Sequence, residues 1–420
     1  MEFVKLTEQE YRDFYNSYEN SSFMQSIELG NLKKMYNQEV HLVGIKDEGK
    51  VVAASLLLSS TTILNKKTFY SPRGLMVDYH NFELLDFFVN NLKKYIKDNG
   101  GFNLTIDPCI IYRERLANGD IKDIENDVKD DLTIDNLKKL GFNHHGFNIY
   151  LDALQARWCY RLKLDENYDL IKSNFSKSVR KNIDSTYKKG LQVRVGTIDD
   201  LDKMTEIFDV TAKRKDFFSR SLDYYKKMYS SMHDLMTIYI AYLDPDIYLE
   251  HTLNTLNEEK KHLEEIEIKF IKDKVGNKLK NEKETCLKRI EKLEIEVEKA
   301  KKFKEENPNG KDIGCLLSIK SGNEYLTLSS GVLEEYKSFT PKYQMYDYHI
   351  KDAYKFGFKY CNFYGITGDF DKSNKYYGIY EFKKGFGGNV IEYVGEFDLE
   401  ITNFNKIYKL LKKIKHLMKK

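Results

Sequence analysis

Paired cysteines are missing from this sequence, and their absence limits its chemistry. The five cysteines of the 420-residue chain stand singly, with no CxxC motif. This spacing argues against a disulfide framework and against a zinc site, and it fits a reducing compartment. The nine histidines are also dispersed, and the adjacent His144 and His145 are expected to lie in a polar loop. We therefore expect no metal and no cofactor.

Long apolar runs are missing as well. No segment approaches the roughly 20 apolar residues that cross a bilayer, and Met1–Asn20 is too polar for a signal peptide. The chain is 41% hydrophobic and 32% charged, which is typical of a globular protein, and its length allows two or three domains. We expect a cytoplasmic protein, and contact with the inner face of the plasma membrane stays open.

Charge of one sign is not in excess either. The chain has 68 Lys and Arg against 65 Asp and Glu, a formal net charge of +3. This balance excludes a protein that binds nucleic acid over its whole surface, but local basic segments remain available for it. Signatures for Ser/His/Asp or Cys/His nucleophiles are absent, and so is a Q/R-x-x-G-x-G/A pyrophosphate loop.

Apolar periodicity predicts an α/β unit over residues 1–155. Thr7 and Glu10 form a capping-box pattern at the start of a helix over Thr7–Asn20. Further helices are predicted over Ser26–Met35, Phe82–Asn99 and Asp135–Leu140. Strands are predicted over His41–Lys46, Val51–Ser59, Thr68–Ser71, Phe102–Asp107 and around His145–Leu151.

A similar mix of predicted helices and strands is found in residues 156–246 and again from residue 309 onward, so a duplicated α/β fold is expected. Between these parts, apolar residues recur every seven positions, at Leu249, Leu256, Leu263 and Phe270. This pattern and the turn Gly276-Asn277 predict an antiparallel coiled-coil arm over residues 247–308, with helices of roughly 40 Å. The candidate roles of such an arm are dimerisation, a solvated strut and binding of a ligand.

Two segments in the C-terminal part of the chain each allow two interpretations. The stretch Tyr360–Val394 contains two strands around Lys383, Lys384 and a glycine-rich turn. On residue types alone it is a surface hairpin with solvated lysines, or a place where a ligand phosphate approaches closely. Residues 403–420 predict a basic amphipathic helix, whose apolar face either docks onto the second unit or rests on an anionic membrane.

The order of these segments resembles the Fem family of peptidoglycan interpeptide-bridge aminoacyltransferases over almost the whole chain. The motifs that carry the resemblance are Ser71-Pro72-Arg73-Gly74, Ile106-Asp107-Pro108, Phe363-Tyr364-Gly365, Phe382-Lys383-Lys384-Gly385-Phe386 and Glu392-Tyr393-Val394-Gly395. The resemblance implies an α/β fold with two acetyltransferase-like (GNAT-like) subdomains. Residues 1–155 form the first subdomain, residues 156–246 and 309–402 form the second, and the arm is inserted in the second.

The resemblance also implies a catalytic set. Lys383, directly after Phe382, matches the family lysine that stabilises negative charge as an ester carbonyl is attacked, with Lys384 as its solvent-facing neighbour. Asp107 matches an acidic residue near the acceptor peptide. The predicted catalytic residues are therefore Lys383, Phe382 and Asp107.

A second implied set binds the substrate. Arg220 and Tyr224 match the residues that hold the precursor's diphosphate and muropeptide, and either Lys33 or Lys34 matches a second phosphate-binding lysine. Phe102 takes the place of a family tyrosine. The predicted substrate-binding residues are Lys33, Lys34, Arg73, Phe102, Arg220, Tyr224 and Tyr364.

The implied function is transfer of Gly, Ala or Ser from aminoacyl-tRNA to the stem-peptide amine of lipid II or UDP-MurNAc-pentapeptide. An amine that attacks an activated ester needs positioning and a nearby cation, so no enzyme nucleophile is expected. The tRNA would contact Arg180-Lys181, Lys188-Lys189 and the arm. The alternatives are an acetyl-CoA-type N-acyltransferase and a non-catalytic protein that binds tRNA or the wall precursor. A homodimer or a Fem-type hetero-partner stays open.

Overall fold

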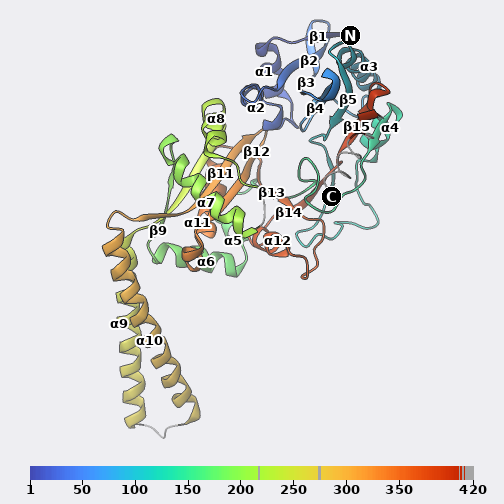
Figure 1. Cartoon of the computed structure of the whole chain (residues 1–420). Helices are drawn as coiled ribbons and strands as arrows, with labels where there is room; N and C mark the ends of the chain where they lie inside the picture. Colours follow the sequence, from blue (N-terminus) through green and yellow to red (C-terminus); the bar gives the residue numbers. More distant parts are fainter. Residues whose placement is uncertain (216–217, 273–275, 406, 409–410, 412–420) are drawn as a thin grey trace.

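Two β-sheets organise the chain in the computed structural model (Figure 1). The structure describes residues 1–215, 218–272, 276–405, 407–408 and 411. Within these ranges the first sheet has the strand order β1-β2-β3-β4-β5-β15-β7, and the second has the order β6-β14-β8-β13-β12-β11-β10-β9. The predicted α/β architecture is confirmed.

The first sheet lies at the N-terminal end of the molecule. Its strands are β1 (Glu2–Lys5), β2 (Glu39–Asp47), β3 (Lys50–Thr61), β4 (Lys67–Ser71), β5 (Gly101–Ile106), β7 (Phe142–His144) and β15 (Phe397–Glu400). Its helices are α1 (Glu8–Ser17), α2 (Ile27–Lys34), α3 (Phe82–Asp98) and α4 (Asp131–Lys139). Thr7 and Glu10 cap α1 reciprocally, as predicted. The apolar side of α3 buries Phe88 and Leu92 in the core of this sheet.

The second sheet has helices on both faces. Its strands are β6 (Ile111–Glu114), β8 (Trp158–Lys163), β9 (Leu191–Val195), β10 (Met236–Leu243), β11 (Lys311–Ser321), β12 (Glu324–Val332), β13 (Tyr360–Ile366) and β14 (Asn389–Tyr393). Its helices are α5 (Tyr168–Ser173), α6 (Lys177–Lys188), α7 (Leu201–Lys215), α8 (Leu222–Met232), α11 (Pro341–Lys355) and α12 (Tyr377–Lys384). Side chains alternate along a strand, so Tyr325 on β12 joins the core under α6 and α11, and Leu326 joins the core under α7 and α8.

The coiled-coil arm is confirmed and projects from the second sheet (Figure 1). It consists of α9 (Pro245–Lys272) and α10 (Asn277–Glu306). A narrow apolar seam joins them, with Leu256, Ile266 and Ile290 among its buried residues. No helix in the described part of the chain is both long enough and apolar enough to cross a bilayer.

The two sheets exchange one strand each. Strand β6 leaves the N-terminal part of the chain and pairs with β14 at the edge of the second sheet. Strand β15 comes from the C-terminal part and lies between β5 and β7 in the first sheet. The predicted ranges 1–155 and 309–402 therefore do not coincide with the two sheets.

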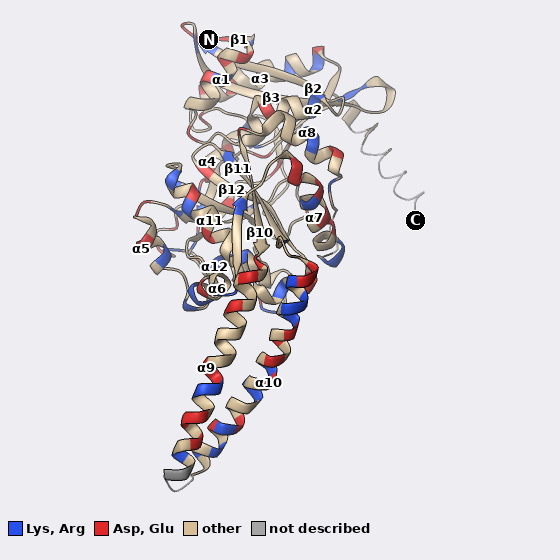
Figure 2. Cartoon of the chain, turned by 90° about the vertical axis from the view of Figure 1, so that its left-hand side faces the viewer, with Lys and Arg blue, Asp and Glu red and all other residues tan. Residues whose placement is uncertain are grey.

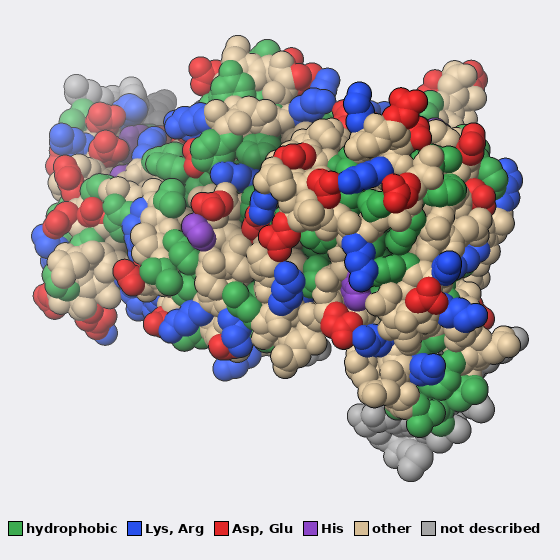
Figure 3. Space-filling model, turned by 90° about the horizontal axis from the view of Figure 1, so that it is seen from above, with side chains coloured by type: hydrophobic (Ala, Val, Ile, Leu, Met, Phe, Trp, Pro, Cys, Tyr) green, Lys and Arg blue, Asp and Glu red, His purple; other side chains and the backbone are tan. Residues whose placement is uncertain are grey.

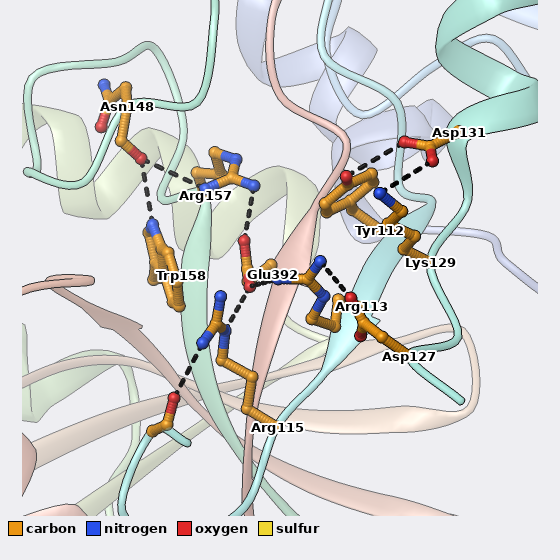
Figure 4. Close-up of polar contacts among 11 residues, drawn as sticks. Tyr112, Arg113, Arg115, Asp127, Lys129, Asp131, Asn148, Arg157, Trp158 and Glu392 are labelled. Atoms are coloured by element: carbon orange, nitrogen blue, oxygen red, sulfur yellow. Dashed lines mark hydrogen bonds and ion pairs between the residues drawn. The ribbon is translucent and has the colours of Figure 1, made fainter. Parts of the chain in front are cut away.

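A buried cluster of charges fixes the first of these exchanges (Figure 4). The Glu392 carboxylate on β14 is 3% exposed, and it pairs with Arg157 at 2.7 Å and with Arg113 at 3.8 Å. It also accepts a hydrogen bond from Arg115, just beyond β6. The fixed donor fork of arginine suits such shared pairing. One carboxylate thus connects β14 to β6 on one side and to the start of β8 on the other.

Several local expectations were wrong. The expected hairpin at 360–394 does not form, because β13 and β14 both pair with β8 and α12 lies between them in sequence. The strand expected around His145–Leu151 ends at His144, whose ring stacks on Phe397 at 4.6 Å instead of lying in a polar loop. Most of the helix expected at 403–420 falls outside the described residues.

We expect Glu392→Gln to lower the free energy of unfolding by about 3–5 kcal/mol, because it removes the counter-charge of the buried Arg157 and of Arg115, while Arg113 keeps its ion pair with Asp127. The matched control is Glu294→Gln, which removes an exposed arm carboxylate paired with Lys260 at 2.8 Å, and should cost below about 1 kcal/mol. Urea denaturation measures both, and equal effects would contradict the proposed clamp.

Candidate active site between the two sheets

Lys383 lies near the C-terminal end of α12 and points into the protein. Its side chain is only 6% exposed, and its Nζ donates hydrogen bonds to the carbonyl oxygens of Gly365 at 2.7 Å and Tyr364 at 3.2 Å. Burial, reinforced by the nearby charge of Lys342, lowers the pKa of Lys383 to about 7. The expectation of a solvated lysine is therefore wrong at this position.

Strand β13 provides those carbonyl groups through a local irregularity. Its register with β8 shifts between Asn362 and Gly365, and Tyr364 has a φ of 61° in the left-handed region. The Tyr364 amide donates to the Asn362 side chain at 2.8 Å. A bulge of this kind redirects backbone groups out of the ladder, and here it supplies acceptors for the Lys383 ammonium.

Two further predictions concern Phe382 and Lys384, the residues on either side of Lys383. Lys384 is half-buried, with its Nζ 5.5 Å from the ring centroid of Tyr380. Phe382 is also half-buried and packs edge-on against Tyr343 at 5.1 Å and Tyr346 at 4.9 Å. This packing holds the turn of α12 that carries Lys383. It gives Phe382 a structural role, and its assignment to catalysis stays a prediction.

Asp107 and Arg73, which follow strands β5 and β4, form the side of the candidate site that the first sheet contributes. We call this side the wall. The Asp107 Oδ1 accepts hydrogen bonds from the Arg73 amide at 2.7 Å and the Tyr70 hydroxyl at 3.1 Å. Its Oδ2 is buried with no partner among the described residues. Burial raises the pKa of Asp107 to about 6, and the nearby charge of Arg73 opposes that rise.

Arg73 and Tyr364 connect this wall to the second sheet. The Arg73 guanidinium lies 4.3 Å from the ring centroid of Tyr393 on β14 and donates to the Ala156 carbonyl at 2.6 Å. The Tyr364 hydroxyl donates to Gln155 at 2.8 Å. Arg73, Tyr364 and Tyr393 line one small cavity. The structure therefore brings together the predicted residues Asp107, Arg73 and Tyr364 from distant parts of the sequence.

Phe102 does not belong to this site. Its ring is completely buried and packs against Phe404 at 5.1 Å and Tyr408 at 4.9 Å between centroids. A ring enclosed in the core does not contact a substrate, so the substrate-binding assignment of Phe102 was wrong.

A second cluster of predicted residues lies where α2 meets α8. Arg220 lies over the Tyr224 ring at 4.9 Å. Burial and the charge of Arg220 both lower the pKa of Lys33. Lys34 points elsewhere, because it pairs with Glu8 at 3.7 Å. Within the described ranges neither Lys33 nor Arg220 forms an ion pair with a carboxylate. Because the charge of Arg220 lowers the pKa of Lys33, the lysine that lies near Arg220 is Lys33 and not Lys34.

Several residues that shape these sites were not predicted from the sequence. Arg157 and Tyr393 had no predicted role, although Tyr393 belongs to the motif Glu392-Tyr393-Val394-Gly395. Arg161 was also missed; it pairs with Glu324 at 3.1 Å and lies over the Tyr360 ring at 3.9 Å. A cavity of about 490 Å³ opens beside it. Its lining includes Glu114, Arg161, Asn174, Tyr360, Gly387 and Asn389. These contacts depend on strand order, for which no local pattern existed.

The fold and these clusters define a two-sheet α/β protein with an inserted coiled-coil arm, a buried lysine of lowered pKa and two neighbouring cations, Lys33 and Arg220, that pair with no carboxylate of the described residues. The chain belongs to the FemAB family, whose model matches residues 6–415. The resemblance stated from the motifs is therefore confirmed.

Relatives match over nearly the full length. The chain is 32% identical to Aminoacyltransferase FemA of Staphylococcus epidermidis over 423 residues, covering 99% of this chain and 100% of that one. It is 31% identical to Aminoacyltransferase FemA of Staphylococcus aureus over 426 residues, covering 99% of both. The crystal structure of FemX superposes with a TM-score of 0.76 at 25% identity, covering 98% of this chain and 99% of that one.

The buried Lys383 predicts a pH dependence of stability. Its pKa falls from the ordinary 10.5 to about 7 on folding, so between those values the unfolded chain binds more protons. The free energy of unfolding should therefore rise with pH above about 7, by up to roughly 1.4 kcal/mol per pH unit from this group, and level off below it.

Chemical denaturation of wild type, Lys383→Met and Lys384→Met at pH 6.5, 7.5 and 8.5 measures this effect. Lys384→Met should keep the wild-type slope, and Lys383→Met should lose a large part of it. An unchanged slope in Lys383→Met would show that Lys383 is not responsible.

Proposed function

We propose that this chain is an aminoacyltransferase that moves an amino acid from aminoacyl-tRNA to the stem-peptide amine of a peptidoglycan precursor. The observation that carries the proposal is Lys383, a buried amine held by two carbonyl groups beside the cavity of Arg73 and Tyr364. Full-length relatives named as aminoacyltransferases support the reaction class.

The chemistry needs one well-placed cation. The neutral acceptor amine attacks the ester carbonyl carbon of the donor, the new N–C bond forms, and the carbonyl oxygen becomes an oxyanion. Lys383 in its ammonium form stabilises that oxyanion in a water-poor site. The ester C–O bond then breaks, and the proton released from the attacking nitrogen passes to the departing ribose oxygen. No bond to the enzyme forms.

The cluster of Lys33, Arg220 and Tyr224 is assigned to the precursor's diphosphate. Lys33 and Arg220 lie together and neither pairs with a carboxylate among the described residues, which favours an anionic ligand because its charge relieves their mutual repulsion. Arginine binds phosphate oxygens through two parallel donors, and lysine adds a compact charge. Either lipid II or UDP-MurNAc-pentapeptide provides such a diphosphate. With lipid II the protein would work at the inner membrane face.

The acceptor peptide is assigned to the wall of Asp107 and Arg73. The Asp107 Oδ2 is buried without a partner among the residues that the structure describes, and a buried carboxylate oxygen favours a hydrogen-bond donor. An amine of the stem peptide supplies that donor and is thereby oriented toward the donor ester.

The reaction is tested with charged tRNA and precursor, following the mass of the acceptor. Glycyl-, alanyl- and seryl-tRNA are compared, and failure to add a residue from any of them would refute the proposal. Lys383→Met should slow transfer by about 10²–10³-fold, as for the loss of one oxyanion donor. The neighbouring Lys384→Met serves as the matched control and should retain most activity.

Replacement of Arg220 tests the diphosphate site. Arg220→Met removes a charge-assisted contact and should raise KM for the precursor about tenfold or more, with a small effect on kcat. Lys34→Met, which removes a cation that points away from Arg220, should leave KM unchanged. If the two variants behave alike, the diphosphate lies elsewhere.

A further inference from the structure

Helix α6 presents an exposed basic surface. Residues 177–189 contain five basic residues and one acidic residue, Asp184. The basic residues are Lys177, Arg180, Lys181, Lys188 and Lys189. All except the half-buried Lys189 are exposed, and the Tyr187 ring between them is 45% exposed. We call this surface the α6 basic face.

Carboxylates of the described residues do not neutralise these side chains. In that part of the chain, none of the five basic residues forms an ion pair. Arg180 donates to the backbone carbonyl of Ser173 instead. Like charges gathered without counter-ions raise the local positive potential, which attracts polyanions.

The arm differs in this respect, although it is rich in lysine. Residues 245–306 hold 15 basic and 16 acidic residues, and red and blue alternate along both arm helices in Figure 2. Many arm lysines are paired, such as Lys260 with Glu294 and Lys283 with Glu267, both at 2.8 Å. Basic and acidic side chains are also interspersed over the face seen in Figure 3.

The α6 basic face begins beside the reactive lysine. The Ser176 amide, at the N-cap of α6, donates to the Gly385 carbonyl at 2.8 Å, and Gly385 follows Lys383 by two residues. A Cβ on Gly385 would lie 2.6 Å from Val179 of α6, so the helix and the end of α12 pack closely. From this point α6 extends roughly 18 Å, toward the base of α9.

We propose that the α6 basic face, and not the arm, binds the RNA of the aminoacyl donor through its phosphates. The inference rests on the proposed function, because a donor whose ester lies at Lys383 must leave the site along a neighbouring surface. Unpaired lysines contact phosphates, and the exposed Tyr187 offers a ring on which a base stacks. An RNA backbone is favoured over a lipid surface because the charges follow one helix away from the reaction centre.

The test compares two double variants of the full chain. Lys181→Gln/Lys188→Gln removes two charges from the α6 basic face. Lys261→Gln/Lys292→Gln is the matched control, since both residues are exposed arm lysines without an ion pair in the described residues. Uncharged tRNA is titrated by fluorescence anisotropy at several salt concentrations, and transfer is measured with aminoacyl-tRNA and with an aminoacylated dinucleotide.

The α6 variant should bind tRNA about tenfold or more weakly, and its salt slope should fall by about one per lysine removed. Its KM for aminoacyl-tRNA should rise, while turnover of the dinucleotide donor stays at the wild-type rate. That retained turnover also shows that the variant is folded. The arm variant should match wild type in every measurement.

Different failures have different meanings. If wild type transfers nothing from either donor, the proposed function falls. If wild type is active but the α6 variant binds tRNA normally, or the arm variant is the weaker binder, the α6 assignment is overturned. Co-sedimentation with vesicles that contain phosphatidylglycerol completes the test, because loss of vesicle binding with intact tRNA binding would assign this face to the membrane.

Discussion

The carboxylate of Glu392 is the group on which the arrangement of the candidate active site depends. It connects β14 to β6 and to the start of β8, and β14 follows directly on the turn after α12. The next residue, Tyr393, lies under the Arg73 guanidinium. A buried carboxylate that serves several guanidinium groups has little freedom to move. Strand β14 therefore helps to fix the positions of both Lys383 and Arg73.

Burial shifts two groups of opposite charge toward neutral pH. The pKa of Asp107 rises to about 6 and that of Lys383 falls to about 7. In both cases the low polarity of the junction disfavours the charged form. Groups shifted in this way are typical of sites that perform chemistry. Near neutrality each group changes its charge easily, which suits a reaction in which an amine gains a bond and loses a proton.

Much of the fold was predictable because its signals are local. The capping box at Thr7, the heptads of the arm and the apolar face of α3 each act within a few turns of helix. The exchange of β6 and β15 was not predictable, since pairing between Phe397 and Ile106 leaves no local pattern. The site followed the same division. Motifs proposed Lys383, Asp107, Arg73 and Arg220 as candidates, but the proximity of Lys33 rather than Lys34 to Arg220 and the burial of Phe102 depend on tertiary contacts.

The exchanged strands also constrain how the protein is made. The first sheet is complete only when β15, at residues 397–400, inserts between β5 and β7. During synthesis the edges of β5 and β7 therefore stay without their common neighbour until nearly the whole chain has left the ribosome. Contacts of such long sequence separation form slowly, and unpaired strand edges attract other chains in the meantime. Biogenesis of this enzyme thus exposes an open sheet for the duration of translation, a burden that a tandem of independent domains would avoid.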